Sequence, residues 1–492
     1  MTRLTMQTVA GLRGRVAVPT YDRAEVRPGI VHFGVGGFHR AHEAMYLDAL
    51  MNAGEALDWG IVGVGLLPQD RRMHTVMTVQ DCLYTLVEKH PDGSLKPRVI
   101  GSIVDYLFGP DDPEAVLTRL TDPATRIVSL TITEGGYHVN QTTGEFDTGD
   151  ADIQHDLVPG SVPRTAFGYI VEALSRRRAA GLDAFTVMSC DNVQANGDVA
   201  RRMIGAFATA KDPELGAWIA EHVSFPSSMV DRITPVTTDT DRQRLADEFD
   251  IEDDWPVSCE PFVQWVIEDR FGAGRPALDR VGVQLVDDVH PYELMKLRLL
   301  NASHQAMCYL GYLAGHRYVH EVCQDPLFVR FLTGYMDREG APSLEPIPGV
   351  DLVAYKQQAI ERFANAEVAD SLARLCADSS DRIPTWLVPV IRDRLAHDGE
   401  VRRSALVVAS WARYAEGLDE QGAPIEVVDR RRHEVMDRAR RQAEEPLAFL
   451  DDRSLFGDLR EQPRFVEPYL AALESLHELG ARSTLEKWEA DA

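Results

Sequence analysis

The chain has no long apolar run and is poor in positive charge for its 492 residues. No stretch approaches the ~20 apolar residues that cross a bilayer, and the residues from Met1 onward lack the apolar core of a secretory signal. Lys and Arg number 51 against 77 Asp and Glu, which gives a formal net charge of −26. Such an acidic surface repels nucleic-acid phosphates and anionic lipid. We therefore expect a cytoplasmic protein with no membrane or nucleic-acid partner.

Cysteine is also scarce. The six cysteines are scattered and form no Cys-x-x-Cys pair, which argues against a disulfide framework or a cysteine zinc site in so large a chain. We expect buried thiols. The sequence contains no P-loop, internal repeat or low-complexity tract.

The length and the change of pattern along the chain predict two domains, because single cores stop growing at about 250–300 residues. Strand-like runs alternate with helical ones up to Val289, and helical patterns dominate afterwards. We predict an α/β fold with a Rossmann-like NAD-binding domain over residues 1–288 and a mostly α-helical substrate and catalytic domain over 289–492. In the second domain we expect helices over 291–313, 325–338, 351–363, 366–377, 386–397, 402–416 and 429–444.

A glycine cluster follows the first β-rich run, and a helix-like stretch over 41–51 follows the cluster. This strand–turn–helix order is the context of a dinucleotide fingerprint, in which glycines let the backbone approach a pyrophosphate at a helix N-terminus. We predict that the cluster binds NAD through Gly34, Val35, Gly36, Gly37, Phe38, His39 and Arg40. A tight turn without a ligand is the alternative, because His39 stands where the fingerprint has its last glycine. The spacing of His39 and His42 could indicate a metal site, but no further ligand pattern accompanies them beyond Glu43, so we predict no bound metal.

An acidic residue follows the next expected strand, over 59–66. In a doubly wound sheet a carboxylate at this edge accepts from the ribose hydroxyls, so Asp70 predicts NAD rather than NADP. The alternatives are a solvated loop Asp70, or admission of a phosphate by Arg71 and Arg72. Further strands are expected over 83–88, 98–107, 126–133, 184–192 and 228–235. Asn192 ends one of them, which places it at the same sheet edge as the glycine cluster.

The stretch from Tyr292 to Tyr312 reads as one α-helix, with no Pro and no Gly before Gly311. Lys296 and Asn301 would lie about 7.5 Å apart along its axis, and with His304 they would span roughly 140° of arc. A deprotonated lysine can take a proton from an alcohol, and an amide N–H can stabilise the alkoxide. An amphipathic helix with a solvated Lys296 is the alternative. His316 and His320 have zinc-like spacing, but no third ligand is evident, so a surface or core pair is expected.

The glycine cluster with His42, the Asp191-Asn192 tip, Val230-Asp231-Arg232 and the Lys296 helix together resemble the polyol-specific long-chain dehydrogenase/reductase family. The resemblance covers nearly the whole chain. Segments 318–321, 325–328, 350–352 and 374–378 are most similar to its mannitol-oxidising branch.

The resemblance implies metal-independent interconversion of D-mannitol, or a similar polyol, and D-fructose by hydride transfer with NAD(H), in a monomer. It implies that Lys296 is the general base, that Asn192 and Asn301 stabilise the oxyanion, and that His304 contacts the substrate. It further implies that Asp231, Arg374 and Arg382 contact the substrate. The mannitol-oxidising branch has a lysine at the position of Arg382, so a planar guanidinium replaces an ammonium group there.

Two other functions fit the same residues. A hexonate–hexuronate oxidoreductase of the same family, similar to fructuronate reductase, would need a cation for a carboxylate. A non-catalytic dinucleotide sensor would bind the nucleotide with an inert Lys296.

Overall fold

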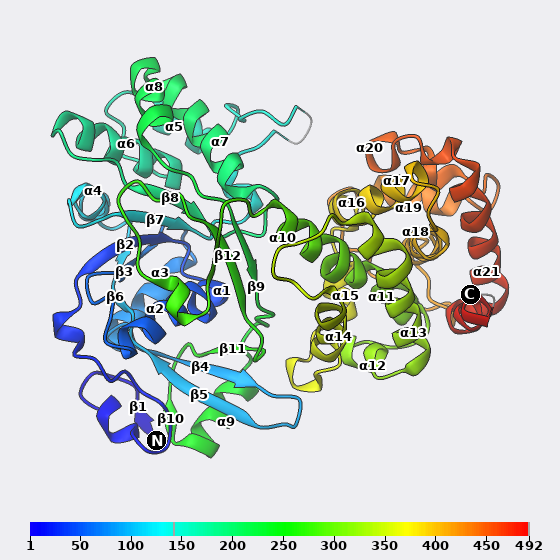
Figure 1. The fold of residues 1–492 in the computed structure, drawn as a ribbon, viewed down its shortest axis with the longest axis horizontal. Coiled ribbons are helices and arrows are strands. Elements are labelled where there is room, and N and C mark those ends of the chain that lie inside the picture. Colours follow the sequence, from blue (N-terminus) through cyan, green and yellow to red (C-terminus); the bar gives the residue numbers. More distant parts are fainter. Residues whose placement is uncertain (141–142, 491–492) are drawn as a thin grey trace. The chain divides into compact units, whose positions relative to one another are not determined.

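The computed structural model describes residues 1–140 and 143–490, and the chain divides into two compact units, Met1–His290 and Pro291–Ala492 (Figure 1). We call them unit 1 and unit 2. The sequence-based boundary lay between residues 288 and 289.

Unit 1 is built on a five-stranded parallel sheet with the strand order β6-β3-β2-β7-β8. Its strands are β2 (Pro28–Phe33), β3 (Gly60–Gly65), β6 (Ile103–Phe108), β7 (Ile127–Leu130) and β8 (Thr186–Ser189). A parallel sheet of alternating strands and helices is the Rossmann-type arrangement, so the predicted fold class is confirmed.

Three smaller sheets complete unit 1, with the strand orders β1-β10, β11-β4-β5 and β13-β12-β9. Their strands are β1 (Thr2–Arg3), β4 (Tyr84–Lys89), β5 (Leu95–Ile100), β9 (Ser228–Asp231), β10 (Ile251–Glu252), β11 (Val257–Cys259), β12 (Gln264–Glu268) and β13 (Gln284–Val286). The single strand expected over 98–107 is wrong. It is divided at Gly101-Ser102, because β5 pairs antiparallel with β4 whereas β6 joins the large sheet.

Helices cover both faces of the large sheet. They are α1 (Gly37–Ala41), α2 (Glu43–Asn52), α3 (Asp70–Val79), α4 (Pro113–Thr121), α5 (Ala151–Leu157), α6 (Ala166–Ala179), α7 (Asn196–Lys211) and α8 (Pro213–His222). The remaining helix, α9 (Asp239–Phe249), packs with the smaller sheets instead. The helix expected over 41–51 is broken at His42, whose φ of −127° and ψ of −94° are not helical.

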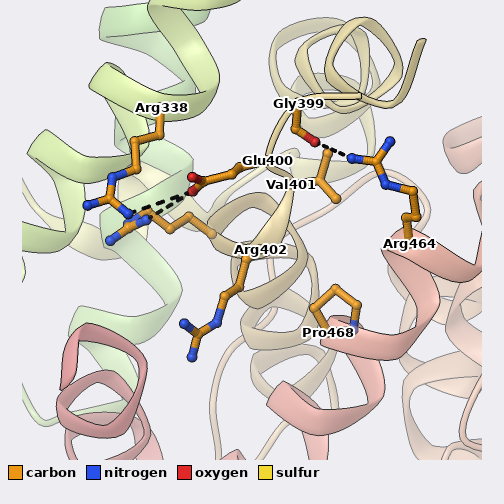
Figure 2. A pocket seen from close by; sticks show the side chains of 8 residues that line it. Arg338, Gly399, Glu400, Val401, Arg402, Arg464 and Pro468 are labelled. Carbon is orange, nitrogen blue, oxygen red and sulfur yellow. Dashed lines mark hydrogen bonds and ion pairs between the residues drawn. The ribbon is translucent and has the colours of Figure 1, made fainter. Parts of the chain in front are cut away.

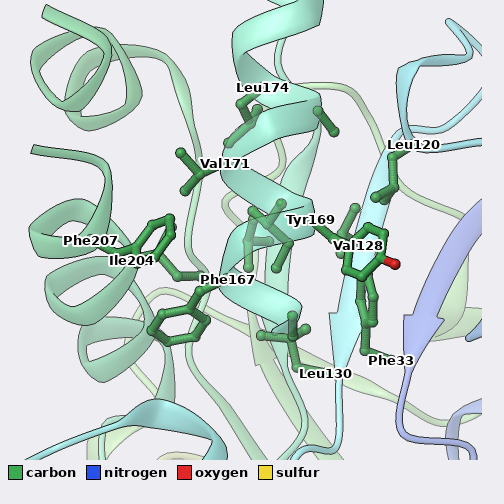
Figure 3. Packing of buried hydrophobic residues seen from close by; sticks show 14 of the residues in the cluster. Phe33, Leu120, Val128, Leu130, Phe167, Tyr169, Val171, Leu174, Ile204 and Phe207 are labelled. Carbon is green, nitrogen blue, oxygen red and sulfur yellow. The ribbon is translucent and has the colours of Figure 1, made fainter. Parts of the chain in front are cut away.

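The two faces of β2 enter different cores. Val31 and Phe33 pack in a cluster with apolar side chains of α4, α6 and α7, such as Phe167 (Figure 3). Ile30 packs in a second cluster with α1 and α2. Because side chains alternate along a strand, His32 shares the second face with Ile30. Full burial of one such apolar side chain contributes about 1.5–3 kcal/mol.

Unit 2 is mostly helical, as predicted. After α10 (His290–Met295), which spans the division, its α-helices are α11 (Ala302–Leu313), α12 (Val319–Cys323), α13 (Pro326–Tyr335), α14 (Leu352–Phe363), α15 (Leu372–Cys376), α16 (Ser379–Arg382), α17 (Val388–Ala396), α18 (Arg402–Ala415), α19 (Arg432–Arg441), α20 (Arg453–Phe456) and α21 (Pro463–Ala490). The single helix expected over 366–377 is wrong, because Ala369 has a φ of +50° and Ser371 caps α15. Helix α21 was not predicted.

Two expectations from the composition can be compared with the structure. All six cysteines are buried free thiols, as expected. Over residues 1–140 and 143–490, no helix has both the length and the apolar character needed to span a bilayer.

Candidate active site

The glycine cluster forms a turn between β2 and α1 that leaves room for a ligand. Gly34 has a φ of +91°, and a Cβ there would lie 2.1 Å from the carbonyl oxygen of Thr131, so only glycine fits. A Cβ on Gly36 would meet nothing closer than 3.9 Å. Gly36 is also the N-cap of α1 and has no side chain to occupy the first amides. This open turn at a helix start fits a dinucleotide pyrophosphate.

Several side chains of the cluster are buried beneath the turn. Val35, His39 and Arg40 are 6%, 1% and 2% exposed. Arg40 donates to the carbonyls of Trp255 and Gly36, and the ring of His39 stacks on that of His32 at 3.4 Å. The predicted cofactor binding by Val35, His39 and Arg40 therefore depends on their backbone and on the shape of the turn.

Asp70 follows the loop after β3 as the first residue of α3, and its carboxylate has a structural role. Its Oδ2 accepts hydrogen bonds from the amides of Leu66 and Leu67, at 3.0 and 2.9 Å. Arg71 forms a two-point ion pair with Asp111, at 2.9 and 2.7 Å. Asp70 thus closes the loop in which it was expected to bind ribose.

Asn192 and Asp231 lie at the ends of β8 and β9, which a buried amide holds together. Asn196 donates to the carbonyls of Asp191 and Ser228, at 2.9 and 2.8 Å, and accepts from the amide of Ser228 at 2.9 Å. Asn192 is exposed and Asp231 is buried. Sequence reasoning missed Asn196. The available signal was an asparagine shortly after the Asp191-Asn192 segment.

In unit 2, Lys296 and Asn301 begin and end a π-helical turn between α10 and α11. The amide of Ala302 donates to the carbonyl of Leu297, five residues back. The predicted uninterrupted α-helix is therefore wrong. Because π-helical hydrogen bonds join residues i and i+5, Lys296 and Asn301 are one turn apart rather than separated by the arc expected of an α-helix.

The predicted catalytic side chains of unit 2 are buried. Lys296, Asn301 and His304 are 8%, 5% and 9% exposed, so the alternative of a solvated lysine is wrong. Within the described residues, Nδ2 of Asn301 and Nε2 of His304 have no hydrogen-bond partner. Buried polar groups are almost always satisfied, so these two donors point to a polar ligand.

Arginines surround His304. Burial lowers the pKa of His304 to about 3, and the charges of Arg374, Arg362 and Arg382 lower it further against the opposing effect of Asp370. The imidazole is therefore neutral at physiological pH and a weak base. Its ring packs 4.7 Å from that of Phe363.

The two predicted substrate-binding arginines are held by their own surroundings. Arg374 forms a two-point ion pair with Asp370, at 2.7 and 2.6 Å, and the hydrogen bonds that it donates to Asp370 raise the pKa of Arg374. Arg382 donates to the carbonyls of Arg374 and Leu375, at 3.1 and 2.9 Å. The structure thus brings His304, Arg374 and Arg382 together.

The described part of the chain contains one group of side chains with metal-ligand geometry. It is His32, His39 and Glu43, whose ligand atoms lie within 4.8 Å of one another. His42, the expected partner of His39, instead binds the carbonyl of Gln264 at 3.0 Å. Sequence reasoning missed His32, although a histidine inside a buried strand was a signal.

A cavity of about 310 Å³ in unit 2 is lined by Arg338, Gly399, Glu400, Val401, Arg402, Arg403, Arg464 and Pro468 (Figure 2). Carboxylates face its guanidinium groups: Glu489 lies 2.9 Å from Arg403, and Asp398 lies 3.0 Å from Arg464. None of the predicted site residues lines it, so we do not assign it to the active site.

Two family models match the chain over most of its length. The mannitol dehydrogenase Rossmann domain matches residues 28–280, and the mannitol dehydrogenase C-terminal domain matches residues 288–477.

Known proteins match over both units. Mannitol 2-dehydrogenase of Aspergillus fumigatus is 48% identical over 480 residues, 96% of this chain and 95% of that protein. The solved ternary complex of Pseudomonas fluorescens mannitol 2-dehydrogenase with NAD and D-mannitol is 48% identical, has a TM-score of 0.90 and is matched over 100% of both chains. A substrate-free D-sorbitol dehydrogenase structure has the same TM-score of 0.90 at 38% identity, over 98% of this chain and 100% of that one.

These matches extend across both units, and the residues of the glycine turn and of the π-helical turn fall within the two matched domains. The resemblance inferred from the motifs is confirmed, and this chain belongs to the mannitol dehydrogenase family.

Proposed function

We propose that the chain is an NAD-dependent polyol dehydrogenase that interconverts D-mannitol, or a similar polyol, and D-fructose without a metal. The observation that carries this proposal is the buried pair of Lys296 and Asn301 at the two ends of one π-helical turn, in a chain 48% identical to a solved mannitol 2-dehydrogenase complex with NAD and D-mannitol.

The cofactor binds at the glycine turn. The open space above Gly36 and the first amides of α1 receive the pyrophosphate. Asp70 favours NAD over NADP, since its Oδ1 remains for a ribose hydroxyl while Oδ2 closes the loop. When bound, NAD⁺ supplies the acceptor for the hydride of the alcohol carbon.

The side chains perform the proton chemistry. Neutral Lys296 takes the proton of the reacting hydroxyl, which a lysine can do when burial lowers its pKa. The amide N–H groups of Asn301 and Asn192 donate to the oxygen as negative charge develops on it. In the reverse direction the ammonium of Lys296 returns the proton.

Substrate recognition uses the neutral His304 together with charged side chains. Nε2 of His304 donates to a substrate hydroxyl, and Asp231, Arg374 and Arg382 contact other hydroxyls of the polyol. Because burial keeps the imidazole of His304 neutral, it can donate a hydrogen bond to an uncharged polyol.

The arginines around His304 support a second candidate, a hexonate–hexuronate oxidoreductase. Arg362, Arg374 and Arg382 bring three positive charges near the imidazole, and the charge of Asp370 opposes them. A substrate carboxylate would be attracted to this region.

The test is a steady-state assay of NADH oxidation with D-fructose and of NAD⁺ reduction with D-mannitol, in parallel with D-mannonate and D-fructuronate. We expect turnover with the first pair and none with the second, and no loss of activity with EDTA. Turnover of the sugar acids alone would establish the second candidate. NADH binding without any turnover would identify a dinucleotide sensor.

We also infer a cytoplasmic monomer with no nucleic-acid partner. Six buried free thiols suit a reducing compartment, and a net charge of −26 disfavours nucleic acid. Analytical ultracentrifugation at several protein concentrations tests the monomer, and a concentration-dependent increase in sedimentation would contradict it.

A further inference from the structure

A buried polar network lies under the glycine turn, on the face of β2 that meets α1 and α2. His32 on β2 and Ser129 on β7 are partners across the two strands. Nδ1 of His32 lies 2.8 Å from Oγ of Ser129 and 3.1 Å from Oε2 of Glu43. Ser129 donates to the same Oε2 at 2.9 Å, and Nδ1 of His39 lies 3.1 Å from it. His32, Ser129 and Glu43 are at most 1% exposed.

The other side of the His32 ring reaches the turn itself. Nε2 of His32 lies 2.9 Å from Oγ1 of Thr131, and Thr131 donates to the carbonyl of Gly34 at 2.6 Å. The same carbonyl accepts from the amide of Gly36 at 2.7 Å. A continuous path of contacts thus connects Glu43 on α2 with the turn.

The directions of these hydrogen bonds follow from the donors available. Thr131 gives its only proton to Gly34, so its oxygen accepts from Nε2 of His32. Ser129 gives its proton to Glu43, so Nδ1 of His32 also meets only acceptors and donates to them. Burial alone would raise the pKa of Glu43, but its close contacts with His32 and His39 outweigh burial and hold that pKa well below its usual range. The carboxylate is therefore the acceptor that orients the ring.

We propose that Glu43 is a positioning residue for cofactor binding. Acting through His32 and Thr131, it fixes the carbonyl of Gly34, which accepts from the amide of Gly36, and with it the turn that directs the amide of Gly37 at the pyrophosphate. This inference rests on the proposed binding of NAD(H) by the glycine turn. A metal at the same three residues is less consistent with the contacts, since both ring nitrogens of His32 already lie within hydrogen-bond distance of protein oxygens.

The first test is Glu43→Gln, which keeps the shape of the side chain and replaces an acceptor oxygen by a donor. We expect the dissociation constant of NADH, measured by fluorescence titration, to rise about tenfold or more, the effect of one hydrogen bond to a charged group. We expect kcat at saturating NADH to stay within about twofold. An unchanged dissociation constant, or a loss confined to kcat, would overturn the proposal.

The matched control is Glu268→Gln on β12. Glu268 is also buried in unit 1, and its carboxylate accepts from the amide of Ser227 at 3.1 Å. We expect this variant to lose thermal stability without changing NADH affinity. An equal loss of NADH affinity in both variants would identify a general effect of destabilisation and overturn the positioning role.

A double-mutant cycle tests the path. Thr131→Val removes the hydroxyl that holds Gly34 and keeps the side-chain shape. If Glu43 acts through Thr131, the double variant should bind NADH about as weakly as the weaker single variant, because coupled residues are not additive. A loss equal to the product of the two single effects would overturn the path.

Three further measurements keep the outcomes distinct. If Glu43→Gln does not fold, Ser129→Ala removes one donor to the same oxygen, and an unchanged dissociation constant for NADH would then overturn the proposal.

Gly36→Ala tests the turn itself. If this variant binds NADH normally, the proposed cofactor site is wrong. If it binds NADH weakly while Glu43→Gln binds it normally, only the positioning role of Glu43 is wrong. Zinc content is measured as well. If the wild-type protein contains one equivalent of zinc and Glu43→Gln contains none, the three residues form a metal site rather than a hydrogen-bonded network, which would overturn the proposal.

Discussion

Lys296 and Asn301 are the first and last residues of one π-helical turn, and both are buried. The turn places the proposed base and the proposed amide donor one helical turn apart, a relationship that an α-helix would give to residues three or four apart. Two further π-helical segments, Met336–Gly340 and Ile383–Leu387, pack against it. π-Helical turns are rare and occur often at functional sites, which fits the chemistry proposed here.

Replacing Lys296 by alanine should abolish most of the activity. We expect kcat to fall by at least 10²–10⁴ in both directions, the usual contribution of a general acid or base, while NADH still binds. The measurement is steady-state kinetics with D-mannitol and D-fructose, together with NADH titration. Lys356→Ala is the control, since Lys356 is another lysine of unit 2 and pairs with Asp337. Similar losses in both variants would contradict the assignment.

The pH profile should report Lys296 rather than His304. With a pKa of about 3, His304 stays neutral over the working range, so it contributes no titration near its ordinary value. Oxidation needs the neutral amine of Lys296 and should rise with pH, and reduction needs the ammonium and should fall. Profiles of kcat/KM in both directions, for wild type and His304→Asn, check this. A limb near pH ~6.5 that disappears in His304→Asn would show that the imidazole is the base.

Asn301→Ala should lower turnover without weakening the binding of the cofactor. Removing one donor to a developing oxyanion costs about 10²–10³ in kcat, and the dissociation constant of NADH should stay the same. Gln442→Ala, which removes another buried amide of unit 2, should affect thermal stability alone. A normal kcat in Asn301→Ala would show that the side-chain amide of Asn301 has only a structural role.

Cofactor choice should respond to Asp70→Asn. Asparagine keeps an oxygen that can accept from the amides of Leu66 and Leu67 and removes the charge that repels a 2′-phosphate. We expect the ratio of kcat/KM for NADP⁺ over NAD⁺ to rise. Asp70→Ser, which loses the acceptor as well, should show the same change of ratio together with a lower melting temperature. A constant ratio in both variants would exclude Asp70 from cofactor selection.

The protein should lose stability on mild acidification because of buried neutral histidines. Burial lowers the pKa of His42 to about 3, despite its hydrogen bond to Gln264. Between the unfolded value of about 6.5 and the folded value, the unfolded chain binds a proton that the folded protein does not, so stability is complete above pH ~6.5 and falls as the pH decreases. His42 alone contributes a slope of about 1.4 kcal/mol per pH unit in that window.

The measurement is the melting temperature between about pH 4 and pH 7 for wild type and His42→Gln. The variant should be less stable at neutral pH, because it loses packing against Trp265, but its melting temperature should depend less on pH. Parallel curves for the two proteins would contradict the prediction.

Local rules were sufficient for the large sheet and for the glycine turn. The apolar runs at β2, β3, β7 and β8 are bounded by turn residues, and a strand followed by glycines and a helix has few alternatives. Only the long-range pairing of β5 with β4 divides a run that reads as one strand.

The geometry of the site depends on packing that the sequence does not display. Lys296 to Asn301 has the composition of an ordinary α-helix, and nothing in it signals the change from i+4 to i+5 hydrogen bonds in a turn that packs against Met336–Gly340. The low pKa of His304 comes from burial and from arginines distant in the chain. Asp70 was expected to follow a strand, but its place as the first residue of α3 and its bonds to Leu66 and Leu67 depend on the shape of its loop.

The π-helical turn also ties the alignment of the two side chains to the hydrogen-bond pattern of the helix. A π-helical turn contains one residue more than the α-helical turn that would replace it. Deleting one residue between Lys296 and Asn301, for example Leu299, would leave the two residues four apart, which is again one turn in a regular α-helix. The shortened helix would therefore keep lysine and asparagine on one face. A substitution that restores regular α-helical hydrogen bonds without shortening the chain would instead separate the two side chains by roughly 140° of arc and inactivate the enzyme.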